Sequence, residues 1–150
     1  MANVRGCNLP DELLYDVENH IWYREEADGN VKLGMTAVAT AMAGQLVAFT
    51  PKKAGRSVEA GKSCATVESG KWVGPAKSAA AGSVVAVNEA LMAKPSLAND
   101  DPYAAWLVVL KPADWASVKP SLIPGSQVAP KYEAKMAADG FAGCAPACPP

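Results

Sequence analysis

Turn-forming residues interrupt this chain at short intervals, and this spacing restricts the fold more than any other feature of the sequence. Alternating apolar and polar segments are separated by glycine, proline, asparagine or aspartate at intervals of about eight to twelve residues. In HIWYREEADGNVKLGMTAV, residues 20–38, two such runs flank residues 27–30. Because Asp-Gly between alternating runs is a strong hairpin signal, we expect two paired strands here. Many short strands of this kind predict a mainly β fold, a small sandwich or barrel.

The rest of the chain extends this pattern and adds short helices. Thr36 is the predicted N-cap of a short helix that ends at Gly44. Because valines fall on both faces of the segment 84–91, we expect a strand that is buried on both sides. Pro95 and Pro102 restrict the stretch that follows to short helical or irregular pieces. The other predicted strands are 45–51, 63–69, 72–79 and 106–112.

The character of the sequence changes near residue 120. Residues 1–120 are expected to form one compact domain, since half of the 150 residues are hydrophobic. Residues 121–150 contain proline or glycine every few positions, and we expect a C-terminal extension that is partly helical or flexible. Within it, only KYEAKMAAD, residues 131–139, is typical of a helix, with Gly140 as its end.

The charge balance excludes several classes of partner. Fourteen basic and fifteen acidic residues leave a net charge of −1, so the sequence predicts no nucleic-acid partner and no attraction to an anionic membrane surface. The first residues lack the pattern of a signal peptide, and the longest weakly polar run, 34–43, is too short to cross a bilayer. We therefore expect a soluble protein located in the cytoplasm.

A lysine stands at the tip of a predicted hairpin. In SCATVESGKWVGPAK, residues 63–77, two alternating runs meet at Lys71. A lysine amine with an ordinary pKa near 10.4 is a poor nucleophile or base at neutral pH, and nothing in the sequence indicates the desolvated pocket that would activate it. A hairpin tip, however, can enter the active site of another enzyme. This position predicts a lysine that is presented for modification.

The residues around Lys71 resemble a known family. TVESGKWVG, then Gly82, then VVAVNEAL and NDDPYAAW follow one another as the motifs of the H protein of the glycine cleavage system do. His20 and Trp22 also match, and the resemblance covers roughly residues 13–118. In that family a Val-Glu-Ser-x-Lys motif carries lipoate on its lysine.

The resemblance implies a role for each matching residue. Lys71 would be the lipoylation site, with lipoate as the covalent cofactor, and a lipoate-attaching enzyme would read Glu68 and Ser69. Gly82 would keep the opposing turn tight by adopting a positive φ. The implied cofactor site comprises Lys71 with Glu68, Ser69, Gly70, Trp72 and Gly82. A set of bracing residues would shape the region: Asn88, Asp101, Pro102 and Tyr103.

The implied fold is the flattened barrel-sandwich hybrid of lipoyl and biotinyl carriers, with short helices added. The biotinyl branch is excluded because its Met-Lys-Met signature is absent: Gly70 and Trp72 flank the lysine. Trp72 is open to two interpretations. Its ring either offers an apolar face to a loaded arm or fills the interior of the barrel.

Several positions depart from an ordinary H protein of glycine cleavage. Gly44-Gln45 stands where the family has Gly-Asp, and Tyr103-Ala104-Ala105-Trp106 replaces Tyr-Gly-x-Gly-Trp. The predicted helix after Thr36 is almost uncharged, and the whole chain is nearly neutral where the family is acidic. Since surface charge governs the choice of partner, we favour the H-like lipoyl proteins of bacterial sulfur oxidation, which work with a heterodisulfide-reductase-like complex. The alternative is the glycine cleavage system itself, with an aminomethyl group as cargo.

The four cysteines, at positions 7, 64, 144 and 148, do not form a dense framework. In a reducing compartment we expect free thiols, with Cys64 buried on its strand and Cys144 and Cys148 in a disordered end. A disulfide switch between Cys144 and Cys148, or a metal site that also takes Cys7 and Cys64, is the basis of a second alternative. In that alternative the protein is a cysteine-based redox or metal module.

No catalytic constellation emerges from the sequence. His20 is the only histidine, and we expect it to be a hydrogen-bonded structural residue. No phosphate-binding glycine loop and no paired-carboxylate motif are present. The sequence therefore predicts a carrier that is not an enzyme and has no metal.

Overall fold

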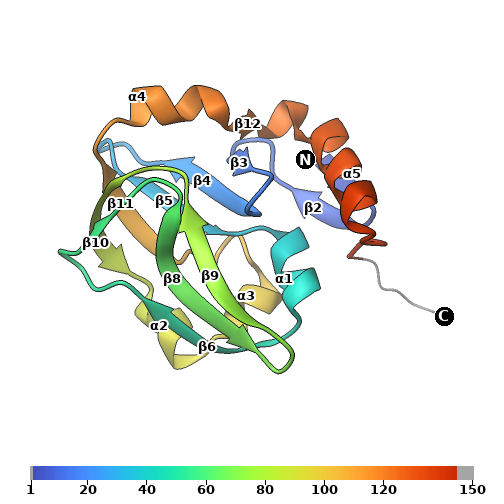
Figure 1. Ribbon diagram of the computed structural model, residues 1–150, viewed down its shortest axis with the longest axis horizontal. Coiled ribbons are helices and arrows are strands. Elements are labelled where there is room, and N and C mark those ends of the chain that lie inside the picture. Colours follow the sequence, from blue (N-terminus) through green and yellow to red (C-terminus); the bar gives the residue numbers. More distant parts are fainter. Residues whose placement is uncertain (1, 145–150) are drawn as a thin grey trace.

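The computed structural model describes residues 2–144 and forms a flattened β-sandwich with short helices, as expected (Figure 1). All strand pairs are antiparallel. One layer is a seven-stranded sheet in the order β12-β3-β4-β5-β11-β10-β7. Its strands are β3 (Leu14–Asp16), β4 (Ile21–Glu25), β5 (Val31–Met35), β7 (Ser57–Val58), β10 (Gly82–Val87), β11 (Val108–Pro112) and β12 (Ile123–Pro124).

A three-stranded sheet forms the second layer, in the order β6-β8-β9. Its strands are β6 (Leu46–Pro51), β8 (Lys62–Ser69) and β9 (Val73–Ser78). The inward faces of the two sheets share one hydrophobic core, in which Tyr23 and Leu33 of the large sheet join Phe49 and Val67 of the small one. The predicted hairpins on both sides of residues 27–30 and of Lys71 are confirmed.

The predicted short helix is also confirmed, and it separates two cores. Helix α1 (Ala37–Ala43) is capped by Thr36, whose hydroxyl oxygen accepts a hydrogen bond from the Ala39 amide at 3.2 Å, and it ends at Gly44 with φ +83°. Ala43 packs into the core between the sheets, whereas Val38 packs into a second core. The other short helices are α2 (Glu89–Ala93), α3 (Leu97–Asp100), α4 (Trp115–Val118), and the 3-10 helices η1 (Lys119–Ser121) and η2 (Gly125–Gln127).

The second core joins the two ends of the described chain. The hairpin of β1 (Ala2–Val4) and β2 (Cys7–Leu9) packs against helix α5 (Val128–Asp139), with α1 beside them. Val128, Tyr132 and Met136 lie four residues apart on one face of α5 and are buried. The expected helix end is confirmed, since Gly140 closes α5 with φ +68°. The helix starts three residues earlier than the sequence indicates. The division of the chain at residue 120 stays a prediction about folding units.

Two expectations about strands and one about cysteines are wrong. Strand β10 stops at Val87, because Asn88 caps α2. Val85 is 42 % exposed rather than buried, and it lies at an irregularity of the β10–β11 pairing, where the register shifts between Val84 and Ala86. Cys7 and Cys144 are not free thiols but form a disulfide. Cys64 is free and buried, as predicted, and Cys148 lies outside the described residues.

Gly82 is required for a different reason from the one the sequence indicated. It does not have a positive φ. It begins β10 opposite Pro112, and a Cβ at this position would lie 2.4 Å from the Lys111 carbonyl oxygen. Close approach of two backbones therefore excludes any side chain.

Gly82→Ala is expected to lower the free energy of unfolding by about 1–3 kcal/mol, because the added methyl group must push two paired strands apart. Urea denaturation measures this loss. Gly70→Ala is the matched control: nothing lies within 4 Å of a Cβ there, so its stability should stay close to that of the wild type. Equal stability of the two variants would contradict the close-approach argument.

Candidate functional site

The β8–β9 hairpin presents Lys71 on a tight, hydrogen-bonded turn. The Ser69 amide donates to the Trp72 carbonyl at 2.7 Å, which closes a loop of Gly70 and Lys71. The Ser69 hydroxyl oxygen accepts from the Lys71 amide at 3.3 Å. Neither loop residue has a positive φ, so a lysine fits this turn without strain. Ser69 itself is buried, and Lys71 and Glu68 are exposed.

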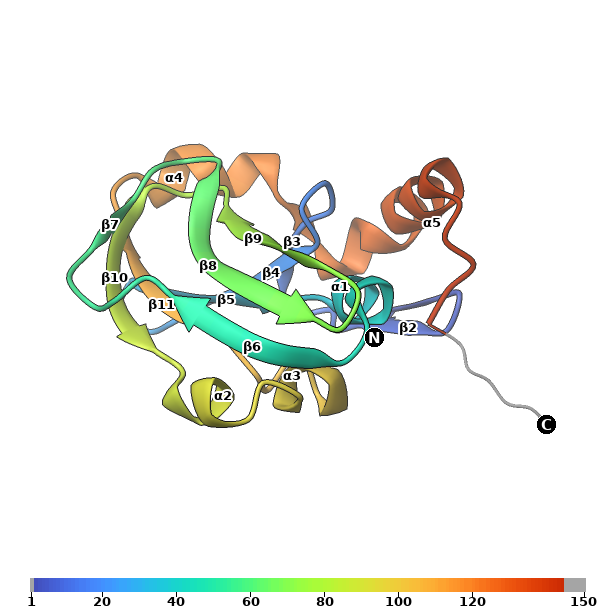
Figure 2. The same cartoon turned by 60° about the horizontal axis from the view of Figure 1, so that its bottom comes forward.

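The tip of the β8–β9 hairpin lies close to α1 (Figure 2), and the Lys71 side chain reaches the end of that helix. A Cβ built on Gly44 would lie 3.3 Å from its Cε atom, so the aliphatic part of Lys71 passes next to the helix end. Within the described part of the chain the ammonium group has no salt-bridge partner. The amine is therefore accessible to another molecule.

Trp72 lies at the surface, and the interpretation that its ring fills the barrel is wrong. The ring covers Gly74: a Cβ on Gly74 would be 2.5 Å from the Trp72 Cζ2 atom. Trp72 is 42 % exposed and forms one wall of a cleft beside Lys71. The interpretation that the ring offers an apolar face next to the lysine agrees with this position.

The cleft has a volume of about 490 Å³ and lies between the β8–β9 hairpin, α1 and the start of β4. Most of its surface is apolar. Its lining residues are Asn19, His20, Ile21, Met35, Ala39, Met42, Ala43, Val67, Lys71, Trp72, Pro75 and Ala76. The contribution of α1 to the cleft was not predicted from the sequence, although the sequence does show the small apolar residues that let this helix pack closely.

No carboxylate is among these lining residues. The two ionisable groups are Lys71 and His20. Burial, and secondarily the charge of Lys135, lowers the pKa of His20, so its imidazole is neutral at pH 7. Once the Lys71 amine is converted to an amide, the cleft carries no formal charge.

His20 is held by the C-terminal helix, and its prediction as a hydrogen-bonded structural residue is confirmed. Its Nδ1 shares a hydrogen bond of 3.1 Å with the Tyr132 hydroxyl, and the two rings stack with centroids 5.7 Å apart. The same hydroxyl shares a hydrogen bond of 3.2 Å with the Thr36 Oγ1 atom. His20 has φ +58°, a left-handed conformation that few residues other than glycine adopt. One wall of the cleft therefore depends on α5.

The bracing residues stabilise the region around the cleft rather than line it. Asn88 caps α2 through Leu91 and donates to the Trp106 carbonyl at 2.8 Å. The Asp101 carboxylate accepts from the Tyr103 amide at 3.1 Å.

Two further contacts connect this segment with the second core. The Pro102 carbonyl accepts from the Trp22 indole at 3.0 Å. The Tyr103 hydroxyl accepts from the Ala37 amide at 3.0 Å and donates to the Asn8 carbonyl. Gly82 is not brought to the lysine, because the whole of β9 lies between Gly82 and the turn.

Comparison with known proteins identifies the family. The family model of the Glycine cleavage H-protein matches residues 13–135. The chain belongs to the glycine cleavage H-protein family. It is 50 % identical over 134 residues to glycine cleavage system H protein 5 of Aquifex aeolicus, covering 86 % of this chain and 90 % of the relative. It is 41 % identical to H protein 2 of the same strain, covering 86 % and 81 %.

A solved structure agrees with this assignment. The glycine cleavage system H protein of Mycobacterium marinum superimposes with a TM-score of 0.71 at 32 % identity, covering 88 % of this chain and 99 % of that one. Members of the H-protein family carry lipoate covalently on a lysine, so lipoate is the cofactor of this chain. An exposed lysine beside an apolar cleft fits such an arm.

Two other findings concern membrane-spanning helices and metal ions. None of the helices in residues 2–144 is long and apolar enough to cross a membrane. The same residues contain no group of three or more side chains suited to hold a metal ion, and the disulfide removes Cys7 and Cys144 as ligands. The pairing of Cys144 with Cys148 is wrong for this structure, since Cys144 is bonded to Cys7.

Stability should fall as the pH drops through 6.5, because His20 is protonated more readily in the unfolded chain than in the folded one. The loss accumulates between 6.5 and the lower pKa of the folded state, and it is complete below that pKa. Urea denaturation of the wild type and of His20→Asn across this range measures it. Asparagine tolerates the left-handed φ but does not titrate, so the variant should lack this component. Parallel curves for both proteins would contradict the assignment.

Proposed function

We propose that Lys71 is the lipoylation site and that the protein is a carrier, not an enzyme, which moves intermediates bound to the lipoyl dithiolane between partner enzymes. The observation that carries this proposal is the exposed Lys71 amine on a closed two-residue turn, with an apolar cleft beside it. The family's lipoyl lysine and the Glu68-Ser69 sequence before Lys71 support it.

The hairpin suits presentation to a lipoate-attaching enzyme. The β8–β9 ladder, paired from Lys62 with Ser78 to Glu68 with Val73, holds the tip in one orientation. Ser69 acts from inside the turn, by fixing the Lys71 amide, whereas Glu68 is exposed and available for contact. Gly70 leaves open space next to the lysine. These residues give the attaching enzyme a rigid substrate with one amine at its tip.

The cleft suits a tethered arm. When bound, the lipoyl group supplies a dithiolane that accepts and releases a cargo. Tethering raises its effective concentration at the partner's active site, and the protein contributes position rather than chemistry. Trp72 and Met42 offer exposed apolar surface on both sides of Lys71, and sulfur makes favourable contacts with aromatic rings. The chain's own residues can therefore shelter the arm between partners.

We further propose sulfur oxidation, with a heterodisulfide-reductase-like complex as partner, as the process this carrier serves. The uncharged lining of the cleft supports this choice: an aminomethyl cargo brings a basic nitrogen, and burying its cation without a carboxylate is costly. The relatives support it too, because one strain of Aquifex aeolicus has several numbered H proteins, which allows division of labour among them.

The alternative is glycine cleavage, with the enzymes of that system as partners. Membership of the H-protein family and the names of the relatives favour it. In either case we place the protein in the cytoplasm, where lipoate-attaching enzymes act on such carriers.

Lys71→Arg should abolish lipoylation, because arginine keeps the charge but offers no acylable amine. Intact mass and peptide mapping of residues 63–77, from protein made in its native host, measure the modification. Lys77→Arg is the matched control, since Lys77 is exposed on the same hairpin, and it should be lipoylated like the wild type. Unmodified Lys71 in wild-type material would contradict the carrier function and favour a cysteine-based module.

The lipoylated protein should support little glycine–bicarbonate exchange when it is mixed with glycine decarboxylase and pyridoxal phosphate. The H protein of Mycobacterium marinum, with its cognate decarboxylase, is the positive control. Exchange at the rate of that control would overturn sulfur oxidation in favour of glycine cleavage, while leaving the lipoylation site intact.

A further inference from the structure

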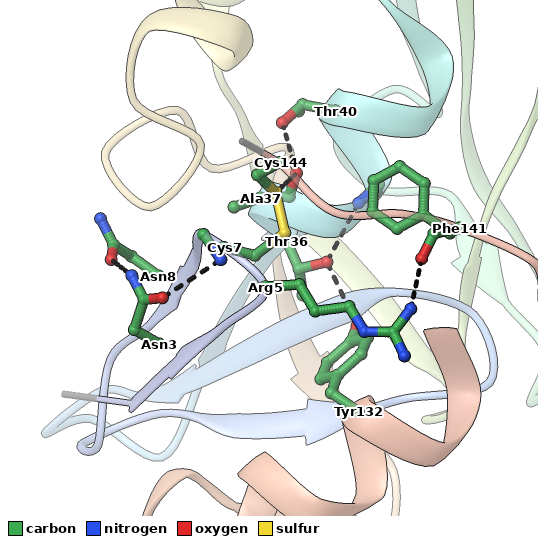
Figure 3. The surroundings of a disulfide bond; sticks show 12 residues. Asn3, Arg5, Cys7, Asn8, Thr36, Ala37, Thr40, Tyr132, Phe141 and Cys144 are labelled. Carbon is green, nitrogen blue, oxygen red and sulfur yellow. Dashed lines mark hydrogen bonds between the residues drawn. A yellow bond between two sulfur atoms is a disulfide. The ribbon is translucent and has the colours of Figure 1, made fainter. Parts of the chain in front are cut away.

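The Cys7–Cys144 disulfide lies where the two ends of the described chain meet α1 (Figure 3). It links residues separated by 137 positions in the sequence. Cys7 is completely buried at the start of β2, whereas Cys144 follows α5 and is only partly covered. The Cys144 sulfur lies 3.5 Å from the Ala37 carbonyl oxygen, at the first turn of α1. Cys144 is therefore the more accessible half of this disulfide.

The disulfide is one of several contacts that attach the C-terminal segment, from α5 to Cys144, to the β1–β2 hairpin. The Cys144 amide donates to the Arg5 carbonyl at 3.0 Å. The Arg5 guanidinium in turn donates to the Phe141 carbonyl at 2.9 Å and to the Glu133 carboxylate at 2.7 Å. Figure 3 shows Arg5 and Phe141 near the disulfide. Apart from the disulfide, these are surface polar contacts, which contribute little individually.

The same segment reaches the cleft through Tyr132. Its hydroxyl contacts both the Thr36 cap of α1 and His20, as described above. α1 and His20 are two walls of the cleft, and on its other face α1 packs through Val38 into the core that contains Cys7 and Tyr132. A change in how firmly α5 is held therefore acts directly on the residues that line the cleft.

We propose that Cys7–Cys144 is a thiol–disulfide exchange site for dithiols, and that its redox state determines how firmly α5 holds the His20 wall of the cleft. The proposal takes one premise from the proposed function, namely the location in the reducing cytoplasm. Disulfides in reducing compartments are usually transient, and act in catalysis or redox sensing. The free thiol is a poor candidate for this role, because burial raises the pKa of Cys64 to about 12.

The exchange is balanced as follows. One thiolate of the dithiol attacks the Cys144 sulfur, the Cys7–Cys144 bond breaks, and Cys7 leaves and takes up a proton. The second thiol of the reductant then attacks the reductant's first sulfur, which is bonded to Cys144 in the mixed disulfide. This step releases Cys144 as a thiol. The dithiol loses two electrons and becomes a cyclic disulfide, the protein disulfide gains both electrons, and the two protons end on Cys7 and Cys144.

The pKa of His20 is expected to change when the disulfide is reduced and α5 loosens. The charged and titratable groups that face it are Asp16 and Glu18 from its own side and Tyr132, Lys135 and Asp139 from α5. Burial is the main cause of its lowered pKa, and the charge of Lys135 adds to it, while Asp139 opposes it. Loosening of α5 admits water to the imidazole. The His20 pKa should then move upward, toward the ordinary value of about 6.5.

The test uses the full chain with Lys71→Arg and Cys148→Ser, so that neither a lipoyl arm nor the C-terminal thiol interferes. Free dihydrolipoamide is the probe. We expect two new thiols per chain, an upward shift of the His20 pKa followed by NMR of the single imidazole, and several-fold faster amide exchange in 128–139. Glutathione at equal thiol concentration should open the site far less, because a monothiol lacks the intramolecular second step.

Cys144→Ser in the same background provides the open state without reductant. It should show the shifted His20 pKa and the faster exchange, and it should not respond to dihydrolipoamide. No new thiols, or new thiols with an unchanged His20 pKa and unchanged exchange of α5, would overturn the proposal. Because Lys71 is absent from every sample, such a failure leaves the carrier function untouched.

Discussion

The pairing of β8 with β9 is the interaction on which the rest of the structure depends. The two strands form the centre and one edge of the smaller sheet, and their inward side chains, such as Val67 and Ala76, close the core over the larger sheet. The same ladder raises Lys71 on a turn of two residues. One element therefore contributes to stability and carries the presented amine, so the site is as rigid as the sandwich itself.

Helix α1 contributes to both hydrophobic cores, and it can do so because the helix and most of its side chains are small. Its seven residues include four alanines, so the helix can lie close to both cores at once. Ala43 faces the sandwich and Val38 faces the core made by the chain ends. A larger helix would shield the cleft from the second core. Because α1 packs into both cores, a displacement of the second core also moves the wall of the cleft. This contact is the structural basis for the proposed coupling between the disulfide and the cleft.

Local signals in the sequence were sufficient for the hairpins, the α1 caps and the lysine turn, because each depends on residues a few positions apart. Thr36 caps the helix three residues ahead, and Ser69 closes its own turn. Distant contacts were not predictable in this way. The partner of Cys7 is 137 residues away, and Tyr132 meets His20 across 112 residues. The exposure of Val85 likewise accompanies the register shift between β10 and β11, which depends on two strands that are distant in the sequence.

The division between bracing and lining residues explains how one scaffold can serve different cargoes. Trp22, Asn88 and Tyr103 each form a hydrogen bond with a backbone group, so replacing any of them would leave a partly buried polar group without that partner. Met42 lines the cleft and is 38 % exposed, so substitution there is expected to cost little stability. The charge of the cleft can therefore change without a change of fold. For this reason family membership identifies the cofactor, while the cargo has to be argued from the few residues beside Lys71.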